Sequence, residues 1–209
     1  MTRVTPERRR PVDLIITAVI VLIVVAVGIV AWVVSPVRNT DSAQAGTPAV
    51  AVAEATTVPE RMVSRWHARS SATDTPAIGD AVVATGDGGS VIGRDPQSGR
   101  EIWGYRRDLP LCTVAAAWQH STDSVLAVYR NSRGCSEVTA LDGKSGRRTA
   151  ARSSDADPTL HLVSDSGYVV AQGTTRLETW GSNLVRGIEY GRVDAPVNPD
   201  AGSYTHLTL

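Results

Sequence analysis

The chain has 209 residues, which is enough for one ordinary domain and too few for two, because domains average about 150 residues. Lysine and arginine together number 21, as do aspartate and glutamate, so the formal net charge is zero. A chain without excess positive charge has no overall field to draw it onto a nucleic acid. Composition therefore argues against a nucleic-acid-binding protein, and it leaves the partner or substrate undefined.

An uninterrupted apolar stretch occupies residues 14–34 and reads LIITAVIVLIVVAVGIVAWVV. At about 1.5 Å per residue, a helix of this length crosses the roughly 30 Å hydrocarbon core of a bilayer. The alternative, a buried core helix, would need a domain large enough to surround it on every side. The stretch therefore predicts a single transmembrane helix.

Arginines are concentrated before this stretch, at Arg3 and Arg8–Arg10, whereas Arg38 alone follows it closely. The positive-inside rule then predicts that residues 1–13 form a cytoplasmic basic tail and that the chain after residue 34 is extracytoplasmic. A cleaved signal peptide competes, because Ala43-Gln44-Ala45 has the small-x-small form of a cleavage site. The apolar stretch exceeds the usual 7 to 15 or so residues of such a peptide, which favours a signal anchor in the cytoplasmic membrane.

Residues 35–59 are rich in alanine, threonine, serine and proline, and no helical or strand period is sustained there. Pro36, Pro48 and Pro59 oppose a continuous helix leaving the membrane. This composition predicts an extracytoplasmic tether.

Short apolar runs separated by tight turns recur from about residue 77 to about residue 191. Around Val82 the chain alternates apolar runs with the turns Gly86–Gly89 and Asp95–Gly99. About 47 residues later, Val125–Tyr129 and Glu137–Leu141 repeat the runs. The second copy closes with the turn Asp142–Gly146, and a weaker third copy has turns at 173–175 and 181–183. Strands repeated with a period of about 40 to 50 residues are typical of propeller blades. We therefore expect an all-β fold in which residues 60–202 form a partial β-propeller of antiparallel meander blades, preceded by the one transmembrane helix.

The second tight turn of each copy carries a specific motif. It resembles the quinoprotein-type (PQQ-like) β-propeller repeat, Ala-x-Asp-x-x-Thr-Gly-x-x-x-Trp, with glycine for alanine and serine for threonine in the first copy. The matching residues are Gly93, Asp95, Ser98, Gly99 and Trp103, and in the second copy Ala140, Asp142, Ser145 and Gly146. Ala150 stands where the second tryptophan would be.

In that family the tryptophan packs between neighbouring blades on the backbone of a glycine turn. The resemblance therefore implies a structural role for Trp103. Together with the anchor, the chain is similar to single-pass, propeller-bearing membrane proteins of unassigned function found in actinobacteria.

Cys112 and Cys135 are the two cysteines of the chain, and both lie on the predicted outer side. An even number of cysteines in an oxidising compartment favours a disulfide between them. A zinc site would need two further ligands, and the histidines at 67, 120, 161 and 206 stand apart from one another.

The sequence contains no Gly-x-Ser-x-Gly, no phosphate-binding loop and no His-Glu-x-x-His. Gly86–Gly89 lies between two predicted strands, which favours a hairpin turn over an anion cradle. Asp155, Asp157 and Asp165 lack the spacing of a calcium loop, so we interpret them as part of a solvated loop. We expect no catalytic, cofactor-binding or metal-binding residues and no cofactor.

The leading hypothesis is a non-catalytic, membrane-anchored extracytoplasmic scaffold that binds another envelope protein, in cell-envelope assembly or surveillance. The alternative is a fragment of a quinone- or calcium-dependent oxidoreductase. The resemblance implies for such enzymes a full ring of tryptophan-docked blades, an axial calcium and usually adjacent cysteines, and this chain departs from each.

Three copies are fewer than the 4 to 8 or so blades of a closed propeller, so we expect a C-terminally truncated fragment. The ending YTHLTL resembles a translated sequencing adapter, and we expect residues 203–209 to be an artefact of that kind. An ordinary final strand is the alternative.

Overall fold

The computed structural model describes residues 11–33, 39–53, 56–57, 60–61, 63–73, 75–164 and 167–190. The chain divides into two units, residues 1–40 and 41–209. Most of the predicted basic tail, the start of the predicted tether and the predicted adapter segment 203–209 lie outside the described residues.

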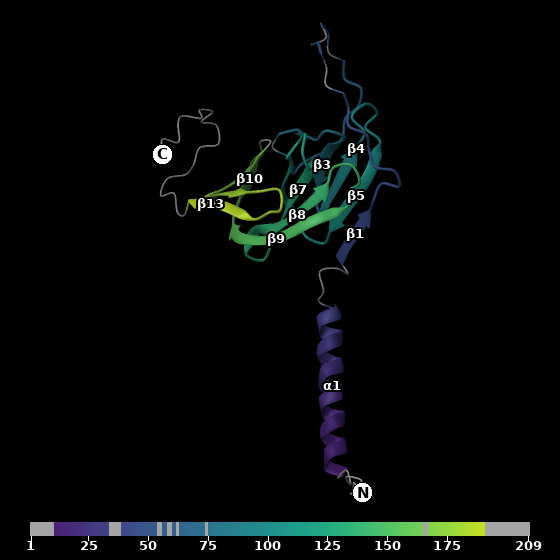
Figure 1. The fold of residues 1–209 in the computed structure, drawn as a ribbon, viewed down its shortest axis with the longest axis vertical. Coiled ribbons are helices and arrows are strands. Elements are labelled where there is room, and N and C mark those ends of the chain that lie inside the picture. The colour runs from purple at the N-terminus through teal and green to yellow at the C-terminus, as the bar shows by residue number, and fades with distance from the viewer. Residues whose placement is uncertain are drawn as a thin grey trace, which may run out of the picture. The chain divides into compact units, whose positions relative to one another are not determined.

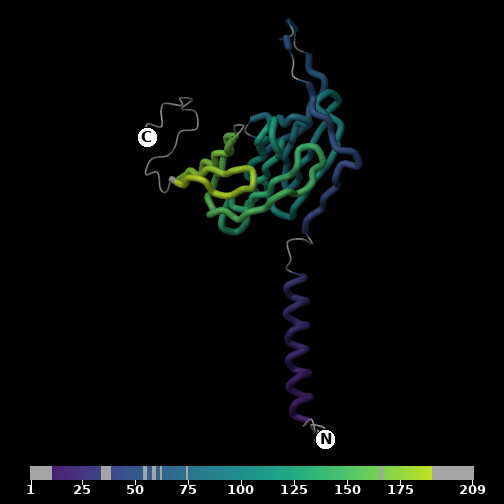
Figure 2. The backbone as a smooth tube through the Cα atoms, viewed as in Figure 1, coloured from purple at the N-terminus to yellow at the C-terminus, as the bar shows by residue number. Residues whose placement is uncertain are grey.

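In the part of the first unit that the structure describes, residues Pro11–Val33 form the helix α1, which Figure 2 shows as a continuous coil. Proline at its first position suits a helix start, because its missing N–H would have no partner there. The helix is apolar on all sides and none of its side chains is buried. It is long and apolar enough to cross a membrane, in agreement with the apolar stretch predicted at residues 14–34.

The second unit consists of antiparallel sheets, as the turn pattern predicts. The first sheet has the order β1-β5-β4-β3-β2, the second β6-β7-β8-β9 and the third β10-β11-β12-β13. Figure 1 shows them following one another across the domain, from β4 and β5 through β7–β9 to β10 and β13.

The bounds of the first sheet are β1 (Thr40–Ala43), β2 (Ala77–Ile78), β3 (Val83–Asp87), β4 (Ser90–Arg94) and β5 (Glu101–Arg107). Those of the second are β6 (Leu111–Ala117), β7 (Ser124–Asn131), β8 (Gly134–Asp142) and β9 (Arg148–Asp157). Those of the third are β10 (Leu160–Ser164), β11 (Val169–Gly173), β12 (Leu177–Trp180) and β13 (Arg186–Tyr190).

The second sheet is buried on both faces. On β7, Val125, Ala127 and Tyr129 face a core shared with the first sheet. Leu126 and Val128 face a second core, shared with the third sheet. A strand buried on both faces needs a continuous apolar run instead of an alternating one, which explains the sequence VLAVY. The strand β6 contacts both β2 and β10, so these three edge strands, one from each sheet, lie next to one another with β6 in the middle.

The stretch predicted to be a tether differs in the structure. Residues Thr40–Ala43 form β1, which is added to the outer strand β5 of the first sheet. Beyond it, the N–H of Ala45 donates to the carbonyl of Ser145 (3.0 Å) and that of Ala49 to the carbonyl of Lys144 (2.9 Å). These contacts use main-chain atoms, which is why a polar sequence without alternation can join the fold.

Candidate functional site

The two motif turns are closed by their aspartates. Oδ1 of Asp95 accepts hydrogen bonds from the N–H (2.7 Å) and hydroxyl (2.9 Å) of Ser98. Oδ1 of Asp142 accepts the same pair of bonds from Ser145, at 2.8 and 2.6 Å. The backbone bond from Ser98, with that from its side chain, lowers the pKa of Asp95 below its usual value. The aspartate and serine of each motif therefore fix the turn.

Trp103 joins the first sheet to the second. Its side chain is 1% exposed, and Nε1 donates to the carbonyl of Gly143 at 2.8 Å. Gly146 has a φ of 72°, and a Cβ on it would lie 2.7 Å from Cγ of the indole. Gly93, paired with Trp103 across β4 and β5, leaves no room for a Cβ beside the same ring. The structure thus brings together Gly93, Trp103 and the Asp142–Gly146 turn at one contact between sheets.

Trp66 makes the same contact on the first sheet, and the sequence motif does not include it. Its Nε1 donates to the carbonyl of Pro96 at 3.0 Å. Gly99 has a φ of 71°, and a Cβ there would lie 2.6 Å from Cδ2 of Trp66. The signal that could have found Trp66 is the Asp95–Gly99 turn itself, since it has the same residue pattern as the Asp142–Gly146 turn, which also carries an indole.

Between the second and third sheets, an arginine makes the contact. Arg152 lies two residues beyond Ala150 on β9, and its guanidinium carbon is 5.8 Å from the ring centroid of Trp180. Its Nη1 donates to the carbonyl of Leu184 at 2.9 Å, in the β12–β13 turn. An amphipathic side chain that stacks on an aromatic face can bridge two sheets as an indole does.

Arg152 also belongs to a network of ion pairs around Glu178, which is 1% exposed. Glu178 lies 3.0 Å from Nε of Arg186 and 3.4 Å from Nη2 of Arg152. Arg176 binds Asp155 on β9 at 2.7 Å. Buried charges need such partners, because desolvating an unpaired carboxylate is costly. Asp155 is 66% exposed, so the predicted solvation holds, but it lies in the strand β9 and not in a loop, and it pairs with Arg176 in the β11–β12 turn.

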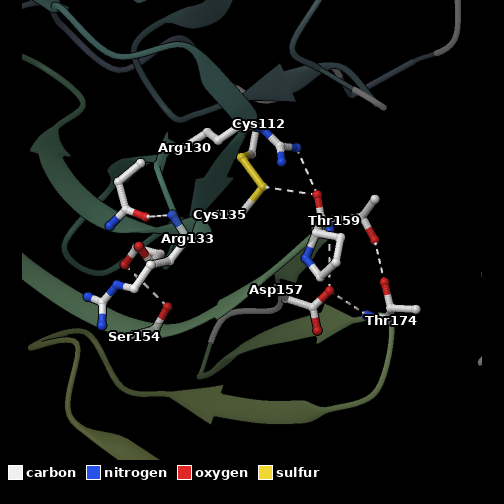
Figure 3. Close-up of a disulfide and its surroundings, with 11 residues drawn as sticks. Cys112, Arg130, Arg133, Cys135, Ser154, Asp157, Thr159 and Thr174 are labelled. Carbon is white, nitrogen blue, oxygen red and sulfur yellow. Dashed lines mark hydrogen bonds between the residues drawn. A yellow bond between two sulfur atoms is a disulfide. The ribbon is translucent and has the colours of Figure 1, made fainter.

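Cys112 of β6 and Cys135 of β8 form a disulfide, drawn in Figure 3, with the two Cα atoms 6.0 Å apart. Pro158, in the link from the second to the third sheet, lies beside it. Its carbonyl accepts a hydrogen bond from Nη2 of Arg130 at 2.7 Å, and Sγ of Cys135 lies 3.7 Å from the same oxygen. The disulfide therefore braces the end of the second sheet where the chain passes to the third.

Asp157, the last residue of β9, fastens this passage, as Figure 3 also shows. Its Oδ1 accepts hydrogen bonds from the N–H of Thr174 (2.9 Å) and of Thr159 (3.2 Å). Burial favours the neutral acid, but these donors together outweigh it and lower the pKa of Asp157. Asp157 is 3% exposed and ends the strand β9, so the prediction that it lies in a solvated loop is wrong. Asp165, the third residue of that prediction, lies outside the described residues.

A cleft of about 440 Å³ opens at the loop end of the first and second sheets. A second hollow of about 650 Å³ shares with it the segment Ala51–Ala53 and Pro96. Residues 51–53 come from the stretch predicted to be a tether, and the N–H of Val52 donates to the carbonyl of Asp80 at 2.8 Å. The first cleft is lined by Ala51, Val52, Ala53, Ile78, Gly79, Asp80, Pro96, Gln119 and His120.

Asp80 and His120 form the polar part of this cleft. Nδ1 of His120 lies 3.5 Å from Oδ1 of Asp80, and the His120 N–H donates to Oδ2 at 2.7 Å. The His120 side chain is 70% exposed, whereas that of Asp80 is 17% exposed. The Asp80 carboxylate thus anchors the loop through the His120 N–H, and the His120 imidazole is exposed to solvent.

Beneath this pair lies Asp123, which is 2% exposed. Its Oδ1 accepts the N–H of Asp80 (2.9 Å) and its carbonyl accepts the N–H of Gly143 (2.7 Å). Oδ2 is buried without a hydrogen-bond partner. Burial raises the pKa of Asp123, and the neighbouring Asp80 and Asp142 act in the same direction, whereas the Asp80 N–H and Lys144 oppose it.

The loop that presents His120 is strained. Trp118, His120 and Asp123 have φ values of 52°, 60° and 39°, in the left-handed region that side chains other than glycine seldom adopt. Such strain persists only where the surroundings hold it, and it gathers at functional sites. The cleft, the exposed imidazole and the strained loop together make this the candidate site.

The cleft can hold an extended peptide chain or a small polar group. The bound group could hydrogen-bond to the imidazole of His120, which the carboxylate of Asp80 contacts. Among the described residues, no three acidic, histidine or cysteine side chains are gathered as metal ligands. Comparison with known proteins finds no family model that matches the chain and no curated protein with significant sequence similarity.

Proposed function

We propose that this protein is a membrane-anchored interaction scaffold whose β domain lies outside the cytoplasmic membrane and binds another envelope protein in envelope assembly or surveillance. The three sheets are consecutive blades of a partial, quinoprotein-type β-propeller. Support for the blades comes from the packing of one meander on the next, from the shared position of β2, β6 and β10, and from the tryptophan that docks on a motif turn.

The observation that carries the binding function is the strained loop 118–123 at the cleft. It presents His120 to solvent, backed by Asp80, beside the extended segment 51–53. An extended partner segment fits here, because the walls are mostly apolar and polar groups stand at one side. The partner's segment is bound by the apolar wall and oriented by hydrogen bonds to the imidazole.

Topology is tested with a reporter that is active only outside the cytoplasm. Fused after Pro59 the reporter should be active, and fused before Asp13 it should be inactive. The reverse pattern would place the domain in the cytoplasm, and a mature chain beginning near Gly46 would show that the anchor is cleaved.

Binding is tested in cells with a photo-crosslinking amino acid at Ala51 in the cleft. Arg133, exposed in the β7–β8 hairpin at the other end of β7, is the matched control position. We expect a discrete crosslinked partner from position 51 and none from 133. His120→Ala should weaken the crosslink several-fold while the melting temperature stays unchanged. Equal crosslinking from both positions, or no effect of His120→Ala, would contradict the proposal.

A further inference from the structure

The small-x-small triplet Ala43-Gln44-Ala45 lies at the junction between β1 and the rest of the β domain. Ala43 is the last residue of β1, and the N–H of Ala45, two residues further, donates to the carbonyl of Ser145 at 3.0 Å. A signal peptidase cleaves after such a triplet, because the enzyme accepts only small side chains at these two positions. The triplet is therefore a candidate cleavage site as well as a structural segment.

In the folded domain, the two alanines that a peptidase would bind lie against the first sheet. Residues two apart in an extended chain point to the same side. Ala43 borders a hollow of about 200 Å³ beside β4 and β5, and Ala45 packs against the core of the first sheet. A peptidase needs an accessible, extended chain whose main-chain groups it can bind. These contacts therefore exclude the peptidase while β1 is paired.

The strand β1 is weakly held, because its pairing with β5 uses main-chain atoms and few side chains. It is an edge strand of four residues, and Asp41, Ser42 and Ala43 are exposed. Of the described residues that make up the two buried cores, none belongs to β1. A segment with few buried contacts opens at a small cost in free energy while the rest of the domain stays folded, and a protease acts on the opened form. Local opening of β1 would thus expose the triplet.

The β domain does not need β1 to complete its sheets. Without β1 the first sheet keeps the four strands β2 to β5, and the second and third sheets have four strands each. The segment after the triplet has its own contacts with the domain. The N–H of Ala49 donates to the carbonyl of Lys144 at 2.9 Å, and that of Val52 to the carbonyl of Asp80 at 2.8 Å. A chain that begins at Gly46 therefore retains both buried cores.

We propose that Ala43–Ala45 is a latent release site, which the pairing of β1 with β5 protects and which a signal-peptidase-type membrane protease cuts after Ala45 when β1 opens. Water is added across the peptide bond between the carbonyl carbon of Ala45 and the nitrogen of Gly46. The products are a carboxylate on Ala45 and a free amine on Gly46. The anchor and β1 stay with the membrane, and the folded β domain is released with its cleft.

This inference rests on the extracytoplasmic location in the proposed function, and the two can fail separately. If the reporter fusions place the domain in the cytoplasm, both fail. If they place it outside and the triplet is never cut, the anchored scaffold stands and the release site alone is lost.

The test expresses the full chain with a C-terminal epitope tag in bacterial cells and determines the N-terminus of the tagged protein by mass spectrometry. We expect the wild type to be full length and membrane-bound. Ser42→Pro removes a main-chain N–H and disfavours pairing with β5, so it should increase a soluble chain that begins at Gly46 by roughly tenfold or more. Val50→Pro is the matched control, because Val50 is 84% exposed and lies beyond the triplet, and this variant should stay full length.

A second substitution tests whether the triplet itself is recognised. Ala43→Arg places a large side chain where the peptidase accepts a small one, and Ala43 is exposed in the fold. Added to Ser42→Pro, it should restore the full-length chain. The released chain should keep the Cys112–Cys135 disulfide and a cooperative melting transition, which distinguishes a cut at an opened β1 from degradation of an unfolded domain.

Three N-terminal results would overturn the proposal. They are a wild-type chain that already begins at Gly46, a Ser42→Pro chain that stays full length, and a new N-terminus within residues 52–56, from the later alanine triplets of the segment. A released chain without a cooperative melting transition would also overturn it, because the domain would then depend on β1.

Discussion

Trp66 and Trp103 occupy equivalent places on successive sheets, although only Trp103 belongs to a strand. Each indole lies on a glycine with positive φ, and each Nε1 donates to a carbonyl of the same turn, that of Pro96 or of Gly143. The segment that contains Trp66 therefore acts on the first sheet as β5 acts on the second. Packing a tryptophan on a glycine turn is therefore a contact that occurs twice in this domain, once on the first sheet and once on the second.

Replacing Trp103 by alanine should lower the free energy of unfolding by about 3 to 5 kcal/mol, because it empties a packed site between two sheets. Trp103→Phe keeps an aromatic ring and loses the hydrogen bond to Gly143, so it should cost less. Urea denaturation followed by circular dichroism measures both. A loss below about 1 kcal/mol for Trp103→Ala would show that the indole is not a packing residue.

Gly146→Ala should destabilise the domain more than Gly88→Ala does. Both glycines have positive φ, 72° and 58°, so both variants carry the strain of about 1 to 2 kcal/mol that a Cβ brings there. At Gly146 the new Cβ also meets the Trp103 ring at 2.7 Å, whereas at Gly88 nothing lies within 4 Å. The difference between the two melting temperatures separates the effect of the contact with the Trp103 ring from that of the backbone strain. Equal losses of melting temperature in the two variants would contradict a role for this contact.

Removing the disulfide should cost about 3 kcal/mol by the loop-closure model, given the separation of 23 residues between Cys112 and Cys135. The double variant Cys112→Ser, Cys135→Ala avoids a lone thiol. Thermal melts with and without reductant provide the comparison, in which reductant should shift the wild type and not the variant. Two thiols alkylated in native protein would contradict the bond.

Asp123→Asn should stabilise the domain near neutral pH. The raised pKa of Asp123 means that its contribution to stability is present below the pKa of the unfolded chain, about 3.9, and is lost as the pH rises through the folded value. Asparagine does not titrate and keeps the oxygen that accepts the Asp80 N–H. The melting temperature of the variant relative to wild type should therefore rise between about pH 4 and pH 7. A difference independent of pH would contradict the burial of a charged Asp123.

Asp157→Asn is the matched control, and its sign is opposite. The lowered pKa of Asp157 means that its contribution is present above about pH 3.9 and is lost as the pH falls through the folded value. The variant should thus be less stable than wild type at neutral pH, and the deficit should shrink in acid.

Much of the fold could be predicted from the sequence, because turns and apolar runs are local signals. Val125–Tyr129 predicted β7, and the Asp95 and Asp142 motifs predicted the two turns that their side chains close. The apolar stretch predicted α1 within a few residues. The strands β1 and β9 escaped, because they lie at sheet edges, where backbone pairing suffices and their sequences need no alternation of apolar residues.

The candidate site was harder to foresee. His120 was considered only as a metal ligand, and nothing local to it predicts that Asp80, forty residues earlier, supports its loop. Arg152 and Trp66 were missed because each contacts a turn of a sheet, as Trp103 does, but lies at a position outside the sequence motif. Contacts between elements distant in sequence depend on register and packing, and a single sequence does not display these.

The chain enters the β domain through β1, whose backbone pairs with β5 and whose side chains are mostly exposed. Any mechanical load that reaches the domain along the chain from α1 therefore acts first on those few main-chain bonds, and only afterwards on the cores between the sheets. Under tension β1 would peel away before the domain unfolds, lengthening the connection while the cleft stays intact. The edge strand is in this sense a mechanical buffer, along the chain, between α1 and the packed cores of the β domain.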